Sequence, residues 1–342
     1  MNHCITGLLV LAASFLLTGV LRRYALKRSL MDVPNARSSH TVPTPRGGGV
    51  AIVCAYLAAL AALVLQGGVA GSAFIALAGA GLLVAVLGFM DDHGHIAARW
   101  RLLGHFCAGA WVLYFVGGMP VVQFAGLRLD AGWLMGVAGL LYLVWMLNLY
   151  NFMDGIDGIA GVQAVTVCLG ICLVYWLDGH VELAWSPLML AAAAAGFLLW
   201  NFPPAKIFMG DAGSGFLGLV LAALSLQGAH VEPGYLWAWL ILMGVFIVDA
   251  TFTLARRLAR GEKVYEAHRS HAYQYASRHF RGHRPVTLAV ALINVLWLLP
   301  MALAVTWLHL DGLAGLLLAY MPLVGLAWKY HAGVRETMNP AV

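Results

Sequence analysis

Residues 72–89 read SAFIALAGAGLLVAVLGF, and this apolar run ends at Met90, Asp91 and Asp92. A helix that crosses a bilayer needs roughly 20 mostly apolar residues, so the stretch predicts a membrane-spanning helix with two adjacent carboxylates at one end. The pattern recurs along the chain, because 62% of the 342 residues are hydrophobic and only 10% are charged. In typical soluble domains, about 45–50% of the residues are hydrophobic and about 25% are charged. This composition excludes a soluble enzyme, a disordered chain and a coiled coil.

Polar or glycine-containing breaks divide the chain into eleven apolar segments of spanning length. We therefore expect an all-α polytopic membrane protein that forms one domain, residues 1–342. Ten spans would also fit, because the break near Gly68 is only glycine-rich. The predicted spans are 4–21, 47–65, 72–89, 102–118, 133–150, 158–177, 186–202, 213–229, 234–254, 286–309 and 312–328.

Lys and Arg residues fall almost entirely on one side of these spans. The segments that follow odd-numbered spans contain 19 of the 20, and the opposite side contains only Arg128. Cytoplasmic loops carry such an excess, so we predict that the Lys- and Arg-rich side faces the cytoplasm. Five polar segments on that side can converge on one surface: 22–46, 90–101, 148–158, 200–213 and 255–285.

Carboxylates on the predicted cytoplasmic side lie at helix ends, beside glycines. The adjacent pair Asp91 and Asp92 repel each other, which raises one pKa unless a cation or a base neutralises them. Asp211 lies where a helix is predicted to begin, so N–H groups favour phosphate there and its carboxylate can hold Mg²⁺. A third cluster lies so close to lipid that its polar groups need partners or water: Asn148, Asn151, Asp154 and Asp157.

Basic side chains accompany these carboxylates, and phosphate binding is a natural role for them. Positive-inside anchoring and contact with anionic lipid head groups are alternative explanations. Asp249, within the ninth span, would cost roughly 2.5–3.5 kcal/mol at a helix centre, so we expect it to face the site or to pair with another helix. The candidate phosphate-binding residues are His40, Arg46, Arg101, His268, Arg269 and His271.

Together the motifs resemble those of the polyprenyl-phosphate N-acetylhexosamine-1-phosphate transferases, a family that includes the phospho-N-acetylmuramoyl-pentapeptide transferases. The segment from Asp32 to Gly48 looks like the branch that starts O-antigen or related glycans. The muramoyl-pentapeptide branch usually has Thr-Pro-Thr-Met-Gly-Gly and a run of histidines, where this chain has PTPRGG at 43–48 and HRSHAYQ at 268–274. The other motifs that carry the resemblance are Asp91-Asp92, Asn151–Gly158 with two Asp-Gly pairs, Phe208–Ser214 and His268–His271.

The resemblance implies a reaction and a location. A HexNAc-1-phosphate (GlcNAc, or a 6-deoxy form such as FucNAc or QuiNAc) would pass from a UDP-sugar to undecaprenyl phosphate, with release of UMP. The product would enter O-antigen, lipopolysaccharide or a related cell-surface glycan. The enzyme would depend on Mg²⁺, with Mn²⁺ as a substitute, and would lie in the bacterial inner membrane with its active site facing the cytoplasm.

Residue roles also follow from the resemblance. Asp211 would bind Mg²⁺, while Asp91 would deprotonate or orient the lipid phosphate, and Asp92 would support it or the metal. Phe208 would stack on uracil. Asn151, Asp154 and Asp157 would line the nucleotide region. His268, Arg269 and His271 would bind phosphate groups.

Alternatives stay open at this point. The same chemistry on UDP-MurNAc-pentapeptide is one, although the motif departures argue against it. A sugar-nucleotide transporter is another, but it would place its charges near the bilayer midplane, often in two repeated halves. One-step transfer and a path through an aspartyl-phosphate both fit, and the sequence does not fix the sugar. We expect UDP-HexNAc, undecaprenyl phosphate and the lipid bilayer as partners, and no nucleic acid; a homodimer stays open.

Overall fold

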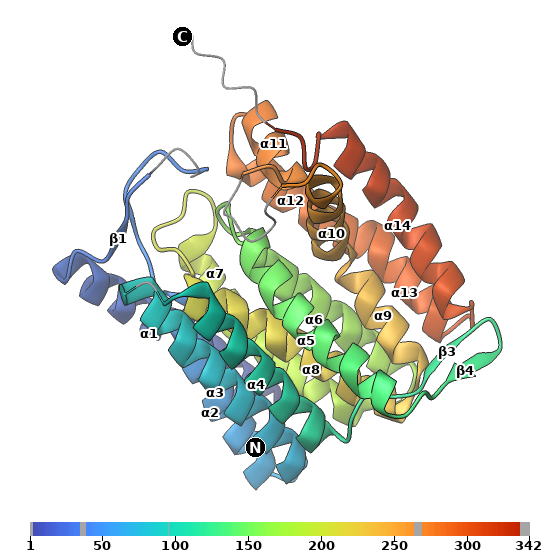
Figure 1. The fold of residues 1–342 in the computed structure, drawn as a ribbon. Helices are drawn as coiled ribbons and strands as arrows, with labels where there is room; N and C mark the ends of the chain where they lie inside the picture. Colours follow the sequence, from blue (N-terminus) through green and yellow to red (C-terminus); the bar gives the residue numbers. More distant parts are fainter. Residues whose placement is uncertain (1–2, 35–38, 95, 263–268, 336–342) are drawn as a thin grey trace.

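The computed structural model describes residues 3–34, 39–94, 96–262 and 269–335. Its long helices lie side by side in one bundle, and their connections form its two ends (Figure 1). Every predicted span falls on one helix or on helices in direct succession. The helices are α1 His3–Lys27, α2 Gly49–Leu65, α3 Gly71–Gly94, α4 Ala98–Val116, α5 Trp133–Met153, α6 Ile159–Leu177, the 3-10 turn Val181–Ala184, α7 Trp185–Asn201, α8 Asp211–Val231, α9 Gly234–Leu242, α10 Gly244–Leu258, α11 Ala272–His279, α12 His283–Ile293, the π turn Asn294–Leu298, α13 Leu299–Thr306 and α14 Gly312–Lys329.

The predicted all-α polytopic membrane architecture is confirmed. In the described residues, eight helical segments are long and apolar enough to cross a membrane, and the bent pair α9–α10 would be a ninth. Helix α2 has only 17 residues, and α4 carries Arg99 and Arg101 in its first turn, which lowers its apolar character. Both nevertheless pack in the bundle against α3. The eleven predicted segments therefore contain eight or nine helices of full spanning character.

Helix α8 forms the centre of the bundle. Its apolar window is 94% buried, against 22% for α1 at the edge. Helices α2, α3, α5, α6, α7 and α9 all pack against it. Because α8 begins with Asp211, the central helix carries a carboxylate at one end of the bundle.

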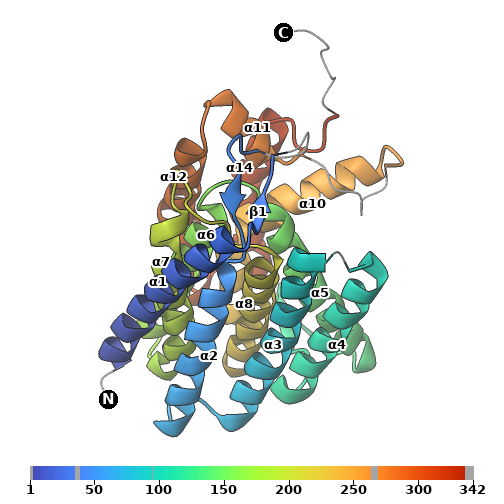
Figure 2. The ribbon, with the colours of Figure 1, turned by 90° about the vertical axis from the view of Figure 1, so that its left-hand side faces the viewer.

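The span predicted over 234–254 is broken. Helices α9 and α10 meet at Met243 with a bend of 72°, and Figure 2 shows α10 pointing away from the bundle. Asp249 on α10 consequently lies beyond the break, beside the short helix α11, whose first N–H groups it accepts. Pairing with another helix, one of the two expectations for Asp249, is confirmed.

The strands of the described residues form two short antiparallel hairpins at opposite ends of the bundle (Figure 1). One pairs β1, Met31–Asp32, with β2, Thr44–Pro45. The other pairs β3, Val122–Phe124, with β4, Leu127–Leu129. The first hairpin lies at the same end as α11, which we call the pocket end. Its register places Asp32 opposite Thr44, so this strand pair positions the chain just before Arg46.

Candidate functional site

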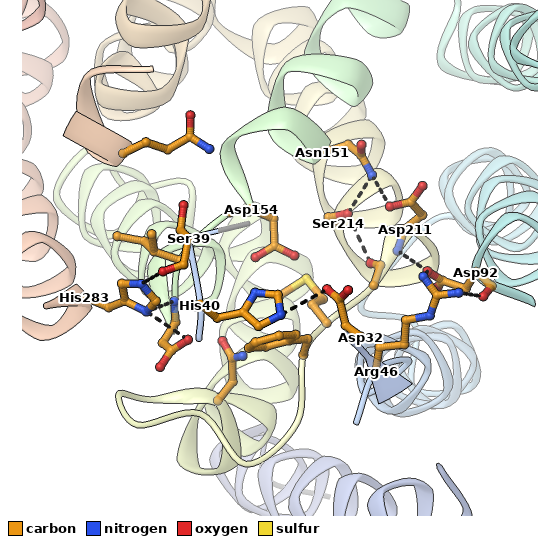
Figure 3. A pocket seen from close by; sticks show the side chains of 18 residues that line it. Asp32, Ser39, His40, Arg46, Asp92, Asn151, Asp154, Asp211, Ser214 and His283 are labelled. Carbon is orange, nitrogen blue, oxygen red and sulfur yellow. Dashed lines mark hydrogen bonds and ion pairs between the residues drawn. The ribbon is translucent and has the colours of Figure 1, made fainter. Parts of the chain in front are cut away.

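A cavity of about 230 Å³ opens at the pocket end, and all five predicted polar segments contribute side chains from loops or helix ends (Figure 3). Segment 90–101 contributes only Asp92, from the last turn of α3. The expected convergence on one surface is therefore observed. The predicted site residues that line the cavity are His40, Arg46, Asp92, Asn151, Asp154, Asp157, Phe208 and Asp211.

Close backbone contacts bring these segments together. A Cβ atom added at Gly88 of α3 would lie 2.5 Å from the backbone nitrogen of Ala212, so α3 packs directly on the first turn of α8. A Cβ at Gly49 of α2 would likewise lie 2.4 Å from Cα of Gly213. Only glycine permits such approaches. They place the end of α3 and the start of α2 against the N-terminus of α8.

Asp211 occupies the first position of α8, as predicted, after Gly210 with a φ of +77°. The Asp211 backbone N–H donates to Oδ1 of Asp92 over 3.3 Å. Asn151, from the last turn of α5, donates its side-chain N–H to Oδ1 of Asp211 (3.1 Å) and to Oγ of Ser214 (2.9 Å). The orientation of the Asp211 carboxylate is thus set from a neighbouring helix.

Two guanidinium groups partly neutralise the carboxylates. Arg101 forms an ion pair with Asp91 and lies 3.6 Å from Oδ2 of Asp211. Arg46 donates to the Asp92 backbone carbonyl and lies 4.0 Å from its Oδ1. Asp91 itself does not line the cavity, because Arg101 and the Ile96 N–H (2.8 Å) hold it. Of the adjacent pair, Asp92 is the one that faces the cavity.

Asp154 lies in the middle of the cavity, between Asp211 on one side and His283 on the other (Figure 3). Burial is the largest cause of a raised pKa at Asp154, and together with nearby negative charges it brings that pKa to about 7; the charges are those of Asp211, Asp92 and Asp157. This carboxyl group therefore changes charge near neutral pH, unlike an exposed aspartate.

On the other side of the cavity, His283 joins three segments of the chain. Its Nδ1 lies 3.0 Å from Oδ1 of Asp157, and its Nε2 lies 3.0 Å from the Ser39 carbonyl oxygen. Asp157 also accepts the Ala205 N–H over 2.9 Å. Burial raises the pKa of Asp157, but the His283 ring and the Ala205 N–H outweigh it, so the net pKa is lowered.

Of the predicted residues at 268–271, the two that the structure describes, Arg269 and His271, do not line the cavity. The His271 ring is only 2% exposed, and its Nδ1 lies 3.3 Å from Oδ1 of Asp249. Asp249 also accepts the N–H groups of Ala272 and Tyr273, both over 2.9 Å, so this pair holds the start of α11. Arg269 is not among the lining residues, and His268 lies outside the described residues.

Asn148 and Arg101 are set back from the main cavity. Asn148 donates its side-chain N–H to the Val144 carbonyl oxygen over 2.7 Å, within its own helix. Both residues line a small void of about 10 Å³ on the far side of Asp211. Arg101 contacts Asp211 from this side, and neither residue lines the larger cavity.

The sequence analysis missed several lining residues. Asn201, at the end of α7, accepts the Gly158 N–H over 3.0 Å and donates to the Ile207 carbonyl over 2.9 Å, so it ties two loops together. His283 follows a glycine at the start of a helix, and this sequence pattern does not by itself indicate a functional site. Other lining residues outside the predicted set are Asp32, Ser39, Gln274 and Ser214.

The oxygen-rich donor set is suited to a hard divalent cation. Oδ2 of Asp92 is buried and has no hydrogen-bond partner among the described residues, and Asp211 begins a helix beside it. In the described chain, no three His, Cys, Asp or Glu side chains enclose a metal by themselves. Mg²⁺ is usually held by one or two carboxylates together with substrate phosphates and water. Asp92 and Asp211 could hold Mg²⁺ in that manner.

Comparison of the sequence with known proteins shows the family to which this chain belongs. The family model for glycosyl transferase family 4 matches residues 74–229. Decaprenyl-phosphate N-acetylglucosaminephosphotransferase of Mycobacterium leprae is 30% identical over 327 residues, covering 84% of this chain and 80% of that protein. The chain belongs to glycosyl transferase family 4.

Other family 4 relatives differ in the acceptor or the sugar that their names state. The probable undecaprenyl-phosphate N-acetylglucosaminyl 1-phosphate transferase of Bacillus subtilis is 28% identical over 288 residues, covering 82% of this chain and 79% of that protein. The phospho-N-acetylmuramoyl-pentapeptide-transferase of Bacillus licheniformis is 25% identical over 246 residues, covering 67% of this chain and 73% of that protein. The resemblance drawn from the motifs is thereby confirmed at the level of the family 4 superfamily.

Proposed function

We propose that this protein transfers an N-acetylhexosamine-1-phosphate from a UDP-sugar to undecaprenyl phosphate, giving the lipid diphosphate sugar and UMP. The observation that carries the proposal is the pair Asp92 and Asp211 at the N-terminus of α8, between Arg46 and Arg101. Phosphoryl transfer depends mainly on positioning and charge neutralisation, and this cluster supplies both. The names of the family 4 relatives support polyprenyl-phosphate acceptors and amino-sugar phosphates.

The cavity is proposed to face the cytoplasm of a bacterial inner membrane. The Lys and Arg distribution along the chain supports this orientation. UDP-sugars are charged and cannot enter from lipid, whereas the acceptor phosphate sits at the membrane surface. A site at the helix ends can meet both substrates.

In the proposed reaction, an oxygen of the acceptor phosphate attacks the phosphorus that bears the sugar. A new P–O bond forms, and the bond from that phosphorus to the oxygen of UMP breaks. UMP leaves with the electron pair. A phosphate monoester is largely ionised at neutral pH, so the acceptor needs orientation more than deprotonation.

The chain's own groups would hold these phosphates. Arg46 presents its guanidinium group in the cavity, while Arg101 neutralises Asp211 from behind it. The first N–H groups of α8 lie beside Asp92 and favour negative charge there. Mg²⁺, when bound, would neutralise phosphate charge and polarise the reacting phosphorus. Asp92 and Asp211 are its proposed ligands, and Asn151 fixes Asp211 in place.

The nucleotide is proposed to lie toward Phe208 and His40. The two rings meet edge to face with centroids 4.8 Å apart, and both line the cavity, where Phe208 is the proposed stacking partner of the base. Asp154 and Asp157 lie beside them in the same cavity and supply polar contacts. We assign the transferred sugar as GlcNAc or a 6-deoxy-HexNAc used to begin a surface glycan such as O-antigen.

UDP-MurNAc-pentapeptide is the second candidate donor. The similarity to the Bacillus licheniformis protein favours it. Against it, residues 43–48 and 268–274 depart from the motifs typical of that branch. The first candidate therefore remains the preferred one.

A turnover assay tests the proposal. Purified protein should convert undecaprenyl phosphate and UDP-GlcNAc to the lipid diphosphate sugar and UMP, and EDTA should abolish the reaction until Mg²⁺ or Mn²⁺ is added. A parallel assay with UDP-MurNAc-pentapeptide separates the two donors. Uptake of UDP-sugar into proteoliposomes without release of UMP would instead identify a transporter and overturn the proposal.

A further inference from the structure

His283 connects parts of the chain that are far apart in the sequence. It is the first residue of α12, and its mostly buried ring lies between Ser39 and Asp157. Nε2 lies 3.0 Å from the Ser39 carbonyl oxygen, and Nδ1 lies 3.0 Å from Oδ1 of Asp157. Ser39 directly precedes His40, whereas Asp157 belongs to the loop between α5 and α6. One ring thus joins two of the segments that line the cavity.

The partners of the His283 ring fix the position of one of its protons. A carbonyl oxygen can only accept a hydrogen bond, so Nε2 donates to Ser39. Nδ1 faces both an acceptor, Oδ1 of Asp157, and a donor, the Asp157 backbone N–H at 3.3 Å. Each nitrogen therefore has a partner whether the ring is neutral or protonated, and the bond to Ser39 persists in both forms.

The first turn of α12 is anchored by a second side chain. Thr287, one turn after His283, is fully buried and donates its hydroxyl group to the Asp157 carbonyl oxygen over 2.8 Å. A Cβ atom added at Gly158 would lie 3.3 Å from Cγ2 of Thr287, so α12 packs closely on this loop. Since His283 and Thr287 are four residues apart on one helix, they lie on the same face. The ring that reaches Ser39 therefore extends from a fixed base.

The bond to Ser39 helps to determine where the next residue, His40, lies. The His40 ring meets the Phe208 ring edge to face, with centroids 4.8 Å apart. Phe208 itself is held by the backbone: its N–H donates to the Pro45 carbonyl oxygen (2.8 Å), and its carbonyl oxygen accepts the Gly48 N–H (2.9 Å). The segment 39–48 is thus attached to the Phe208 loop at one end and to α12 at the other.

Two buried polar atoms of this segment have no hydrogen-bond partner among the described residues. They are Oγ of Ser39 and Nε2 of His40. Buried polar atoms are normally satisfied, so the two atoms point to a ligand. Both residues line the cavity beside Phe208, where the base is proposed to stack. Ribose hydroxyl groups and the carbonyl groups of uracil can supply the partners.

We infer that His283 is a positioning residue: it holds Ser39 and His40 in the geometry that binds the uridine part of the donor. The inference rests on the proposed function, which assigns the nucleotide to this side of the cavity. His283 acts through the Ser39 carbonyl and not on the reacting phosphates, because the proposed metal ligands lie on the other side of Asp154 (Figure 3). Its loss should therefore weaken donor binding and leave the chemical step largely intact.

Two substitutions separate the two contacts of the ring. In His283→Gln, the side-chain amide takes the place of Nε2 and can donate to Ser39, whereas the shorter amide of His283→Asn takes the place of Nδ1 and reaches only Asp157. UMP is the probe, because every UDP-sugar contains it, and its binding to the full-length protein in neutral detergent is measured by calorimetry. The Kd of UMP should rise about five- to ten-fold in His283→Asn, as expected for one lost hydrogen bond, and stay within about two-fold of the wild type in His283→Gln.

Turnover with UDP-GlcNAc and undecaprenyl phosphate gives a second readout. His283→Asn should raise the KM for the donor by about five- to ten-fold and change kcat by less than about two-fold, because binding and not chemistry is affected. The matched control is His279→Gln, at an exposed histidine of α11 that is not among the lining residues, and it should leave both constants unchanged. A lower kcat at unchanged KM would overturn the positioning role. So would wild-type UMP binding in both His283 variants, or an equal loss in both.

A double-mutant cycle tests whether His283 acts through His40. His40→Ala should itself weaken UMP binding, and His283→Asn should then cause a smaller further loss than it causes in the wild type, because the ring that it positions is already absent. Independent losses that multiply would show that His283 acts by another route and would contradict the inference. Wild-type UMP binding by His40→Ala would also contradict it, even if His283→Asn did not fold.

The two proposals fail in different ways. Absence of transfer with every UDP-HexNAc would overturn the proposed function. The UMP measurements need no turnover, so the difference between His283→Asn and His283→Gln still decides whether His283 positions a nucleotide-binding segment.

Discussion

Asp211 combines three constraints at one side chain: it begins the central helix, accepts a hydrogen bond from Asn151 and lies 3.6 Å from Arg101. Asp211→Asn retains the shape and removes the charge. We expect kcat to fall by about 10²–10³-fold, the range seen when one electrostatic stabiliser of a transition state is removed. The Mg²⁺ concentration for half-maximal activity should rise. Asp130→Asn, exposed at the opposite end of the bundle, is the matched control and should retain full turnover.

Asp154 should make stability depend on pH. Its pKa is raised from an unfolded value of about 3.9 to about 7 in the fold. A carboxyl group with a raised folded pKa contributes stability that is complete below the unfolded pKa and is lost as pH rises through the folded value. In EDTA, the wild type should therefore lose stability relative to Asp154→Asn between about pH 4 and pH 7. Melting temperatures across that interval measure the difference, and parallel curves would contradict the assignment.

At the residue scale, the sequence predicts many of the side chains that line the candidate site, but not all of their partners. The Asp91-Asp92 pair and Asp211 were predicted to act together, and the structure brings them together. His271 was expected to bind phosphate, but it pairs with Asp249, a residue 22 positions earlier. The two meet where the start of α11 packs against α10, and a local sequence pattern carries no record of such a contact.

At the element scale, close contacts between α8 and glycines of the neighbouring helices α2 and α3 set the site geometry. Gly88→Ala would place a methyl group 2.5 Å from the backbone of Ala212, so α3 and α8 would have to separate. We expect a lower melting temperature and at least about ten-fold lower kcat, since small misplacements of reacting groups cost up to about 10²-fold. Gly136→Ala on α5 is the control, because its Cβ would meet nothing within 4 Å. Equal activity of both variants would show that the close packing is dispensable.

The hydropathy pattern predicts where the helices lie, but it does not predict where they bend or change their hydrogen-bonding pattern. All eleven apolar segments are helical because a spanning segment must satisfy its backbone hydrogen bonds internally. The break at Met243 and the π turn at Asn294–Leu298 lie inside apolar runs. Packing against neighbouring helices determines such features, so composition gives no signal for them.

For the whole molecule, the two hairpins mark opposite ends and permit a direct test of orientation. Val42 lies near β2 at the pocket end, and Leu127 lies in β4; both are exposed. In a variant without native cysteines, a membrane-impermeant maleimide added to intact spheroplasts should label Leu127→Cys and leave Val42→Cys unlabelled until the membrane is opened. The reverse pattern would place the cavity outside the cytoplasm.

Helix α8 meets other helices over nearly its whole surface. During synthesis it enters the membrane after α1–α7 and before α9–α14, so at first some of its surface must face lipid. Its burial is completed only when the later helices dock. The helix that begins with Asp211 is therefore inserted before all of its packing partners exist. A chain truncated after α8 should contain an inserted but incompletely packed α8 that is exposed to membrane quality-control proteases.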